Sequence, residues 1–564
     1  MTEPGHARLA RGPDPPKPGL EPRFERFVDT GGQGIVRRAA STLRHGLALA
    51  FGGLGAWTRD LPDAERTRPR FLLLRAFAAV GSLPVSRRVR RQPLPVQLRL
   101  RLEMLGPTYI KLGQILSLRE DLLPKAVTDE LGRLLDRLPA VPYEQVIGIV
   151  ERELRRPVDE VFAHVRSTPL GSASIGQTHV ATTLAGEQVV LKVVKPGIRR
   201  TLRRDTLLLR LLGRVLQLFL PRFQPRRVID EFCHYTLREA DLSYEADNAE
   251  TFAANFRDHE GVVFPRIHRE LSTASLLTME LLEGIQPNDP RALALRAEDR
   301  ERLVALGAEA IISMLYRDGF FHADLHPANL LVLPGPKIGF VDLGIVGRLE
   351  ADVKRALLYY YYCLVIGDTE SAAGYLAALA EPGPGADLAG FRRDVEEVSQ
   401  QWLHRARFAS FSVGRLILQS IGYAARRRVS FPVEMVLMVK ALATFEAVGN
   451  RLLPGFDVVK VSRPHVHRIL LERFAPTHLA QESLTALPEL ADAMAKVPRL
   501  IIEGLHLVEK ATRRPAENPL AGLRASLFGG ACLVAGAVLI AFDGPRVLGA
   551  ALLLAGVLVA LRRA

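Results

Sequence analysis

The spacing of apolar residues divides the middle of the chain into helical and extended stretches. Between about residues 96 and 165, apolar side chains recur every three or four positions, with breaks at Gly106-Pro107 and Pro124. This periodicity predicts a series of amphipathic helices. Residues 170–195 change to alternating or clustered β-branched residues around the turn sequence LAGE, which predicts a β-hairpin.

Helical and strand-like patterns alternate after this hairpin. Helices are expected over 198–220 and through the acidic stretch 228–256, whereas 262–284 has the character of strands. From about residue 298 onward long amphipathic helices dominate, and one compact segment, 319–347, interrupts them. The patterns together predict an α+β fold in which a strand-rich region precedes a helical one.

Composition and charge restrict the class of protein. The chain has 564 residues, of which 48% are hydrophobic and 24% charged, so several globular domains are expected and wholesale disorder is not. The net charge of +14 fits an arginine-rich solvated surface, a nucleic-acid partner or an anionic membrane surface. No zinc-finger spacing or aromatic-basic strip supports nucleic acid, so no nucleic-acid partner is expected. Cys233, Cys363 and Cys532 lie too far apart for a disulfide framework.

The first part of the chain predicts little regular structure. Residues 1 to about 40 are rich in proline and glycine and are expected to form a flexible tail. The apolar stretch 45–57 is too short and too rich in glycine to span a bilayer. We expect it to pack against the body of the protein, with a membrane-interface position as the alternative.

Two apolar runs near the end of the chain predict a membrane hairpin. Residues 525–542 carry no charge, DGPR follows as a turn, and residues 547–561 are apolar again. A helical hairpin over 521–564 would span the bilayer, and the flanking arginines would keep both ends in the cytoplasm. We therefore expect the protein at the cytoplasmic membrane with its globular part on the cytoplasmic side. A buried soluble hairpin is the alternative.

Polar side chains with catalytic potential concentrate in the segment 319–347. Asp324 and Asn329 fall in a loop between a helix and a short strand, and Asp342 follows in the sequence VDLG. Two carboxylates and an amide supply oxygen ligands, which suit Mg²⁺ holding phosphates. We assign Asp324 to the acceptor hydroxyl as the catalytic carboxylate, and Asn329 and Asp342 to the metal. Structural roles, or a zinc site on His322 and His326, are the alternatives, but zinc leaves Asn329 and Asp342 without a role.

A glycine-type loop and a lysine precede this segment. In PLGSASIGQTH, Gly171 and Gly176 take the first and last positions of a G-x-G-x-x-G pattern, and Ala173 takes the middle one. Lys192 lies on the next predicted strand, and Glu245 lies on a following helix. In this order Lys192 is expected to hold the α- and β-phosphates of a nucleotide, and Glu245 to hold Lys192. The candidate ATP-binding residues are Gly171, Ser172, Ala173, Ser174, Gly176, Lys192, Glu245 and Glu280.

Four motifs give a specific family resemblance. They are KLGQ (111–114), GSASIGQTH (171–179), EADLSYE (239–245), and HADLHPAN (322–329) with DLG (342–344). On these residues, over about 96–350, the chain resembles the AarF/UbiB (ABC1, or ADCK) family of atypical protein-kinase-like proteins. The resemblance implies a two-lobed protein-kinase-like fold with extra N-terminal helices packed over the active site.

The resemblance also implies roles for family-specific residues. Lys111 and Gln114 would reach from one face of a helix into the nucleotide pocket, and Glu239 would pair with Lys111. Glu239 and Asp241 match the E-x-D pair of the family. Without the other motifs, the favoured interpretation is that Lys111 extends over the surface and Gln114 caps a turn. Glu239 and Asp241 could form a solvated helix face.

The activity implied by the resemblance is nucleotide chemistry at a membrane. Members bind ATP or ADP with Mg²⁺ or Mn²⁺, hydrolyse ATP, phosphorylate proteins in trans poorly, and support ubiquinone or related isoprenoid-quinone biosynthesis. Partners would be a membrane lipid or quinone precursor and quinone-biosynthesis proteins, and a homodimer is left open. A small-molecule phosphotransferase and a nucleotide-binding pseudokinase scaffold are the competing functions.

The loop departs from the commonest form of the family, in which alanines stand at the positions of Gly171 and Ser172. A Cβ at Ala173 limits how closely the backbone approaches phosphates, so nucleotide preference should differ from that of ordinary kinases.

The domain boundaries follow from these patterns. We expect a variable region (1–95), a helical extension (96–167), a kinase-like N-lobe (168–285), a C-lobe (286–460), a helical linker (461–520) and the hairpin (521–564).

Overall fold

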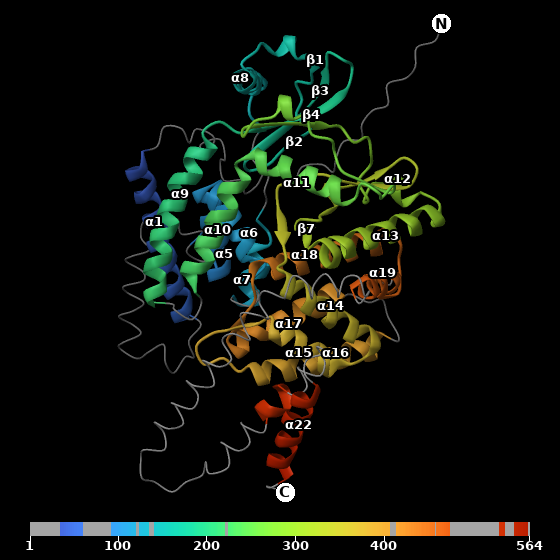
Figure 1. Cartoon of the computed structure of the whole chain (residues 1–564). Coiled ribbons are helices and arrows are strands. Elements are labelled where there is room, and N and C mark those ends of the chain that lie inside the picture. The colour runs from blue at the N-terminus through green and yellow to red at the C-terminus, as the bar shows by residue number, and fades with distance from the viewer. Residues whose placement is uncertain are drawn as a thin grey trace. The chain divides into compact units, whose positions relative to one another are not determined.

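The computed structural model describes residues 34–59, 89, 92–119, 123–134, 140–219, 224–406, 413–456, 458–473, 530–535 and 546–561. The chain divides into two units, Met1–Leu471 and Glu472–Ala564. All four motifs lie in the first unit, which holds a strand-rich lobe, a group of helices beside it and a helical lobe (Figure 1).

The strand-rich lobe is built on a five-stranded antiparallel sheet. The order is β1 (Phe162–Val165), β3 (Gly176–Thr183), β4 (Gln188–Val194) and β6 (Leu276–Glu280), with β2 (Gly171–Ser172) also paired to β3. The predicted hairpin is confirmed as β3 and β4, with Thr182 opposite Gln188 and Gly186 in the turn at φ +85°. The prediction of helix up to residue 165 is wrong at its end, because β1 is too short to show a two-residue period.

Alternate residues of β4 enter two different cores, as the two-residue period of a strand requires. Val189, Leu191 and Val193 pack with Val146 and Val150 of α8 (Tyr143–Leu154). On the other face, Val190 and Val194 pack with residues of α9 (Ile198–Phe219) and α11 (Leu242–Asn255). Lys192 also belongs to this second face, which turns toward α11.

A group of helices lies beside the sheet. They are α1 (Ile35–Arg59), α5 (Leu94–Leu105), α6 (Pro107–Leu116), α7 (Lys125–Leu131) and α10 (Pro225–Glu239), together with α9. Only part of this group, α6, α7 and most of α5, falls within the predicted extension 96–167. Gly106, at φ +92°, separates α5 from α6, and Pro107 begins α6 where no backbone donor is needed. The core of this group is formed by residues such as Leu105, Ile110 and Phe232, all nearly inaccessible to solvent.

The predicted flexible tail, residues 1 to about 40, overlaps the start of a helix in the structure. Helix α1 begins at Ile35, and Arg38 Nε donates to Asp205 Oδ1 of α9 at 2.6 Å. Farther along α1, Ala48 is buried and Gly53 lies against Leu94 of α5. The expected packing of this apolar stretch against the body is therefore present, and residues 1–33 lie outside the described part.

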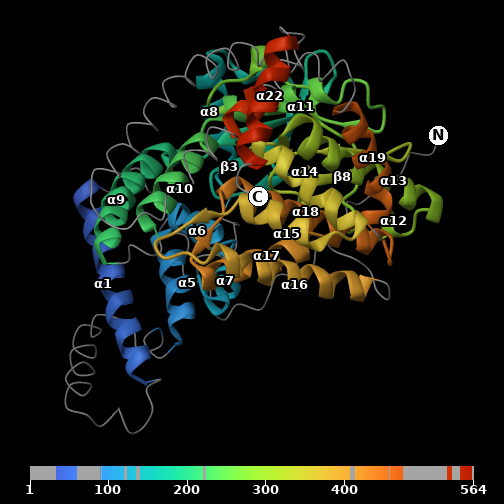
Figure 2. The ribbon, with the colours of Figure 1, turned by 60° about the horizontal axis from the view of Figure 1, so that its bottom comes forward.

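The helical lobe carries short strands that hold the HADLHPAN and DLG motifs. Helix α13 (Ala297–Ile312) leads to β7 (Phe320–His322), which pairs with β10 (Val346–Arg348). Strand β9 (Lys337–Phe340) pairs with β8 (Leu330–Leu333) and with β5 (Val262–Val263). Six further helices complete the lobe (Figure 2): α14 (Ala351–Ile366), α15 (Thr369–Ala378), α16 (Leu388–Ala406), α17 (Val413–Arg427), α18 (Val433–Leu452) and α19 (Val458–Arg473).

The second unit contains the predicted membrane hairpin, of which only part is described. Residues 530–535 and α22 (Arg546–Leu561) are helical and fall within the two apolar runs. The remaining residues of the predicted hairpin, 521–529, 536–545 and 562–564, lie outside the described part. Within the described residues, no helix combines the length and apolar character that a membrane span needs. Spanning therefore stays a prediction.

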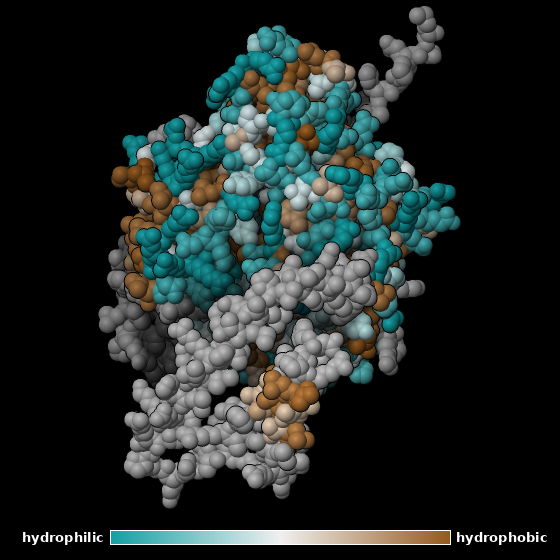
Figure 3. All heavy atoms as spheres, in the orientation of Figure 1, coloured by the Kyte–Doolittle hydropathy of each residue, from teal (hydrophilic) through white to brown (hydrophobic). Residues whose placement is uncertain are grey.

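The surface over α1 and α9 carries exposed apolar side chains, visible as a brown patch at the left edge of Figure 3. On α9, Leu207, Leu211, Val215 and Leu218 are 57%, 57%, 44% and 79% exposed. Their spacing of three and four residues places them on one face of the helix.

Candidate active site

Three charged side chains from distant parts of the chain meet between the lobes. Lys192 Nζ of β4 donates to Glu245 Oε1 of α11 at 2.8 Å and to Asp342 Oδ1 at 2.6 Å. Glu245 is nearly inaccessible, with 6% of its side chain exposed, whereas 52% of the Asp342 side chain is exposed. Asp342 therefore keeps a face open to a ligand while it contacts the lysine.

Burial and the neighbouring charges shift the pKa of each member of this trio. Burial opposes the charge on Lys192, but the nearby Asp342 and Glu245 carboxylates outweigh it and raise the lysine's pKa. The Lys192 ammonium lowers the pKa of Asp342, while burial raises the pKa of the Glu245 carboxyl. Lys192 and Asp342 are consequently both charged at neutral pH. A lysine must be charged to bind phosphates, and a carboxylate must be charged to bind a cation.

The DLG loop holds Asp342 in an unusual backbone conformation. Its φ is +57°, in the left-handed region that aspartate and asparagine tolerate better than most side chains. Asn248 Nδ2 of α11 donates to the Leu343 carbonyl at 2.9 Å. The Ala323 N–H donates to the Ile345 carbonyl at 3.0 Å. The DLG loop is thus tied both to the helix that carries Glu245 and to the HADLHPAN segment.

The backbone of Asp324 is fixed by its neighbours in HADLHPAN. The Asp324 N–H donates to His322 Nδ1 at 3.1 Å, and His322 Nε2 donates to the Val341 carbonyl at 3.1 Å. Burial lowers the pKa of His322, which keeps the ring neutral and able to accept at Nδ1. Asn329 Nδ2 donates to the Asp324 carbonyl at 3.0 Å.

Oxygen donors for a divalent metal converge beside this loop. Strands β8 and β9 pair Leu330 with Phe340, and the Val341 N–H donates to the Asn329 carbonyl at 3.0 Å. This pairing brings Asn329 close to Asp342. The amide nitrogen of Asn329 is used by Asp324, which leaves its side-chain oxygen for a ligand. An amide oxygen and an ionised carboxylate fit Mg²⁺.

The zinc alternative is not supported. Both ring nitrogens of His322 are engaged by the backbone, at Asp324 and Val341. Across the described ranges, His, Cys, Asp and Glu side chains form no group of three or more that could hold a metal ion. The His-x-Asp-x-His sequence serves the backbone of its own loop instead.

The glycine-type loop is a tight turn between β2 and β3. The Ala173 N–H donates to the Gly176 carbonyl at 2.9 Å, and Ile175 at the tip is buried in the core of the lobe. A Cβ added at Gly176 would lie 3.8 Å from Lys192 Cε, so the turn covers the lysine stem. Ser174 is 1% exposed, and its Oγ has no hydrogen-bond partner among the described residues. The loop therefore holds a buried hydroxyl that has no partner among the described residues.

The family-specific residues are arranged in two different ways. Lys111 Nζ of α6 pairs with Glu239 Oε1 at the end of α10. Gln114 of α6 lines, together with these two residues, the cavity described below. Asp241 instead accepts from the Ser243 N–H at 3.1 Å and caps α11. Glu280, at the end of β6, accepts from the Arg266 N–H at 3.2 Å and has no described contact with Lys192, Asp324 or Asp342.

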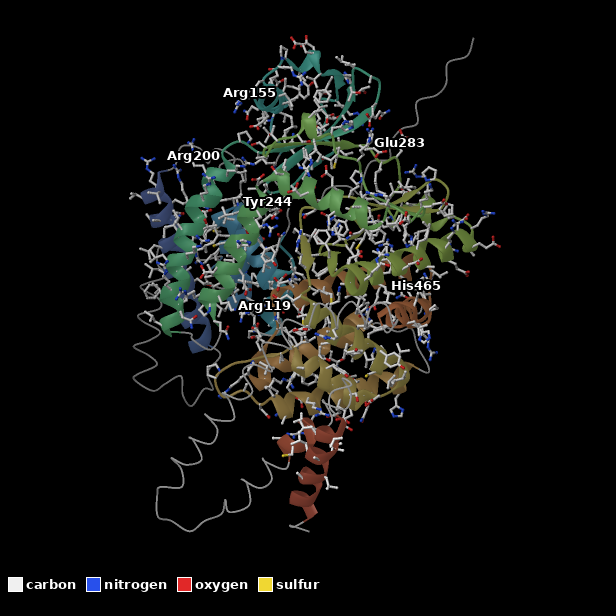
Figure 4. All side chains as sticks on the ribbon, viewed as in Figure 1. Arg119, Arg155, Arg200, Tyr244, Glu283 and His465 are labelled. Atoms are coloured by element: carbon white, nitrogen blue, oxygen red, sulfur yellow. The ribbon has the colours of Figure 1, made fainter. Side chains whose placement is uncertain are left out.

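A cavity of about 970 Å³ opens beside Asp324. Its walls come from α6, α7, α10, α11, the HADLHPAN and DLG loops and α18, and Tyr244 and Arg119, both labelled in Figure 4, are among the lining residues. Apolar side chains such as Leu118, Leu134 and Leu437 face it together with charged ones. The space therefore suits an amphipathic molecule.

The sequence interpretation missed the contribution of α18. Lys440 Nζ lies 3.1 Å from Asp324 Oδ1, and the Tyr235 hydroxyl donates to Glu434 Oε1 at 2.8 Å, linking α10 to α18. The available signal was a lone lysine within the apolar run VEMVLMVKALATF. The apolar helices after residue 350 otherwise form core, as Tyr360 and Leu364 show.

Comparison with known proteins shows the family of this chain. Residues 133–376 match the family model of the ABC1 atypical kinase-like domain, and residues 401–457 match that of the UbiB helical domain. A "Probable protein kinase UbiB" of Marinobacter nauticus is 32% identical over 75% of this chain and 78% of its own length. The protein of the same name from Azotobacter vinelandii is 32% identical over 81% and 86%.

Among solved structures, the complex of Rv3197 with erythromycin from Mycobacterium tuberculosis is similar with a TM-score of 0.46 and 24% identity. The similarity covers 62% of this chain and 90% of that one. The sequence matches run through both the kinase-like and the helical segments, and the kinase-like fold with extra helices is confirmed. The chain belongs to the UbiB family of ABC1 atypical kinase-like proteins.

Proposed function

We propose that this chain is a Mg²⁺-dependent ATPase or atypical kinase that acts at the cytoplasmic membrane in ubiquinone or other isoprenoid-quinone biosynthesis. The observation that carries the proposal is the meeting of Lys192, Glu245 and Asp342 beside Asp324 and Asn329. Family membership supports kinase-type chemistry, and the site contains the side chains that such chemistry needs.

Each residue has a defined task in the proposed reaction. Lys192 binds the α- and β-phosphates, and the unused Ser174 hydroxyl donates to a phosphate oxygen. Asn329 and Asp342 would hold Mg²⁺, which would neutralise phosphate charge when bound. The acceptor oxygen forms a bond with the γ-phosphorus as the bond between that phosphorus and the bridging oxygen of ADP breaks. The Asp324 carboxylate takes the proton of the acceptor hydroxyl.

The cavity beside Asp324 supports an amphipathic acceptor or effector. A hydroxyl at the polar end would reach Asp324, while an apolar body would lie against Leu118, Leu134 and Leu437. A membrane lipid or a quinone precursor has this combination of properties. Water is the acceptor when the protein acts as an ATPase.

Metal removal tests the proposed reaction. The purified protein should release phosphate from ATP with Mg²⁺, lose that activity in excess chelator, and regain it when Mg²⁺ or Mn²⁺ is restored. Liposomes with anionic lipids, or phenolic quinone precursors, should stimulate the rate. Phosphate release that is unaffected by chelation would contradict the assignment of Asn329 and Asp342.

Membrane attachment is the second part of the proposal. The apolar runs of 521–564 and the apolar face of α9, which is flanked by Arg203, Arg210 and Arg214, support it. Deleting residues 521–564 should move the protein from the membrane to the soluble fraction of a cell extract. Full-length protein already in the soluble fraction would contradict the hairpin.

A further inference from the structure

One face of α18 forms a wall of the cavity beside the catalytic loop. Val433, Val436, Leu437 and Lys440 occupy positions i, i+3, i+4 and i+7 of the helix, which share one face, and all four line the cavity. Three are apolar and the last is cationic. Helix α18 belongs to the segment matched by the UbiB helical domain, outside the matched kinase-like domain.

Lys440 directly contacts the proposed catalytic carboxylate. Its Nζ lies 3.1 Å from Asp324 Oδ1, and the two side chains are 38% and 26% exposed. On the other side, His326 Nε2 lies farther away, 3.7 Å from Asp324 Oδ2. His322 and Asn329 fix the Asp324 backbone but not the rotation of its carboxylate. The orientation of that carboxylate therefore depends on a lysine 116 residues farther along the chain.

Helix α18 is itself held firmly enough to present Lys440 at a fixed position. At its start, Glu434 Oε1 accepts from the Tyr235 hydroxyl of α10 at 2.8 Å. After Lys440, Phe445 packs so closely on α13 that a Cβ at Gly307 would lie 2.6 Å from its ring. A side chain on such a supported helix can keep the geometry that catalysis requires.

We propose that Lys440 is a positioning residue, which holds the Asp324 carboxylate toward the acceptor hydroxyl. The inference rests on the proposed function and goes beyond it, because it makes the helical domain part of the active site. General-base catalysis requires the base within hydrogen-bond reach of the proton that it takes. A displacement of about 1 Å costs on the order of 100-fold in rate.

Replacing Lys440 with methionine tests the proposal, because methionine keeps most of the stem but removes the charge. For Lys440→Met we expect kcat for phosphate release to fall roughly 10- to 100-fold. The KM for ATP should change by less than about two-fold, because Lys192 and Asp342 are untouched. Lys440→Arg keeps a cationic donor and should restore a large part of kcat.

Arg427→Met serves as the matched control. Arg427 Nε pairs with Asp394 Oδ2 at 2.7 Å in the same helical region, with 35% and 19% of the two side chains exposed, and does not line the cavity. This variant should turn over ATP like the wild type, and its urea unfolding midpoint should match that of Lys440→Met.

If the wild type turns over ATP, three results would overturn this inference and leave the proposed function standing. The first is a wild-type kcat in Lys440→Met, and the second is no recovery of kcat in Lys440→Arg. The third is a loss of kcat in Lys440→Met that accompanies a lowered urea unfolding midpoint. Wild-type protein that releases no more phosphate than Asp342→Asn would instead overturn the proposed function, and this inference with it.

Discussion

Asp342→Asn is expected to lower Mg²⁺-dependent ATP turnover at least about 100-fold without unfolding the protein. The carboxylate is charged at neutral pH because Lys192 lowers its pKa, and half of the side chain is open to a metal. Asparagine removes that charge but keeps the size of the side chain. It also tolerates the φ of +57° at this position, so the loop backbone should survive.

Steady-state phosphate release measures the turnover of Asp342→Asn, and urea unfolding measures its stability. Asp247→Asn is the matched control, because Asp247 lies on neighbouring α11, pairs with Arg269, is 62% exposed, and does not line the cavity. The control should keep wild-type turnover. Equal turnover in wild type and Asp342→Asn, at equal stability, would show that this carboxylate holds no catalytic metal.

Phe252→Ala is expected to lower the free energy of unfolding by about 3–5 kcal/mol. Phe252 is fully buried and stacks on Phe264 with ring centroids 5.1 Å apart. The centroids of the Phe252 and Phe320 rings are 4.6 Å apart. Phe264 in turn stacks on Phe340, two residues before Asp342. The substitution leaves a cavity among rings that join α11 to the strands of the catalytic loops.

Urea unfolding gives the magnitude for Phe252→Ala, and Leu184→Ala is the control. Leu184 lies at the β3–β4 turn with 63% of its surface exposed, so its truncation should change stability by less than about 0.5 kcal/mol. Glu245, Asn248 and Phe252 share one face of α11, so the loosened helix should also reduce turnover. Wild-type stability in Phe252→Ala would contradict the role of the aromatic cluster.

Features encoded in neighbouring residues were predictable from the sequence. The β3–β4 hairpin follows from a two-residue period and a glycine turn, and its register places Lys192 opposite Thr178 of β3. The HADLHPAN and DLG motifs carry residue types that suit a metal and a hydroxyl acceptor. Their convergence follows from one short antiparallel pair, β8 and β9.

Features that depend on packing between distant segments were not predictable. A lysine on an apolar helix face looks the same in sequence whether it extends into solvent or contacts Asp324, so the role of Lys440 had no local signal strong enough to find it. The burial of the tip of the glycine-type loop was likewise not predictable from the sequence. Its pattern predicts a phosphate loop, but only the folded core explains why Ile175 is buried there.

The most direct test of the account is a single-turnover reaction with purified protein in excess over γ-labelled ATP and Mg²⁺. We predict that each ATP consumed yields one ADP, with the label on inorganic phosphate or on a lipid-extractable acceptor. The Asp342→Asn variant should leave the ATP intact. Nucleotide that binds the wild type tightly yet is recovered unchanged would contradict catalysis and indicate a nucleotide-binding scaffold.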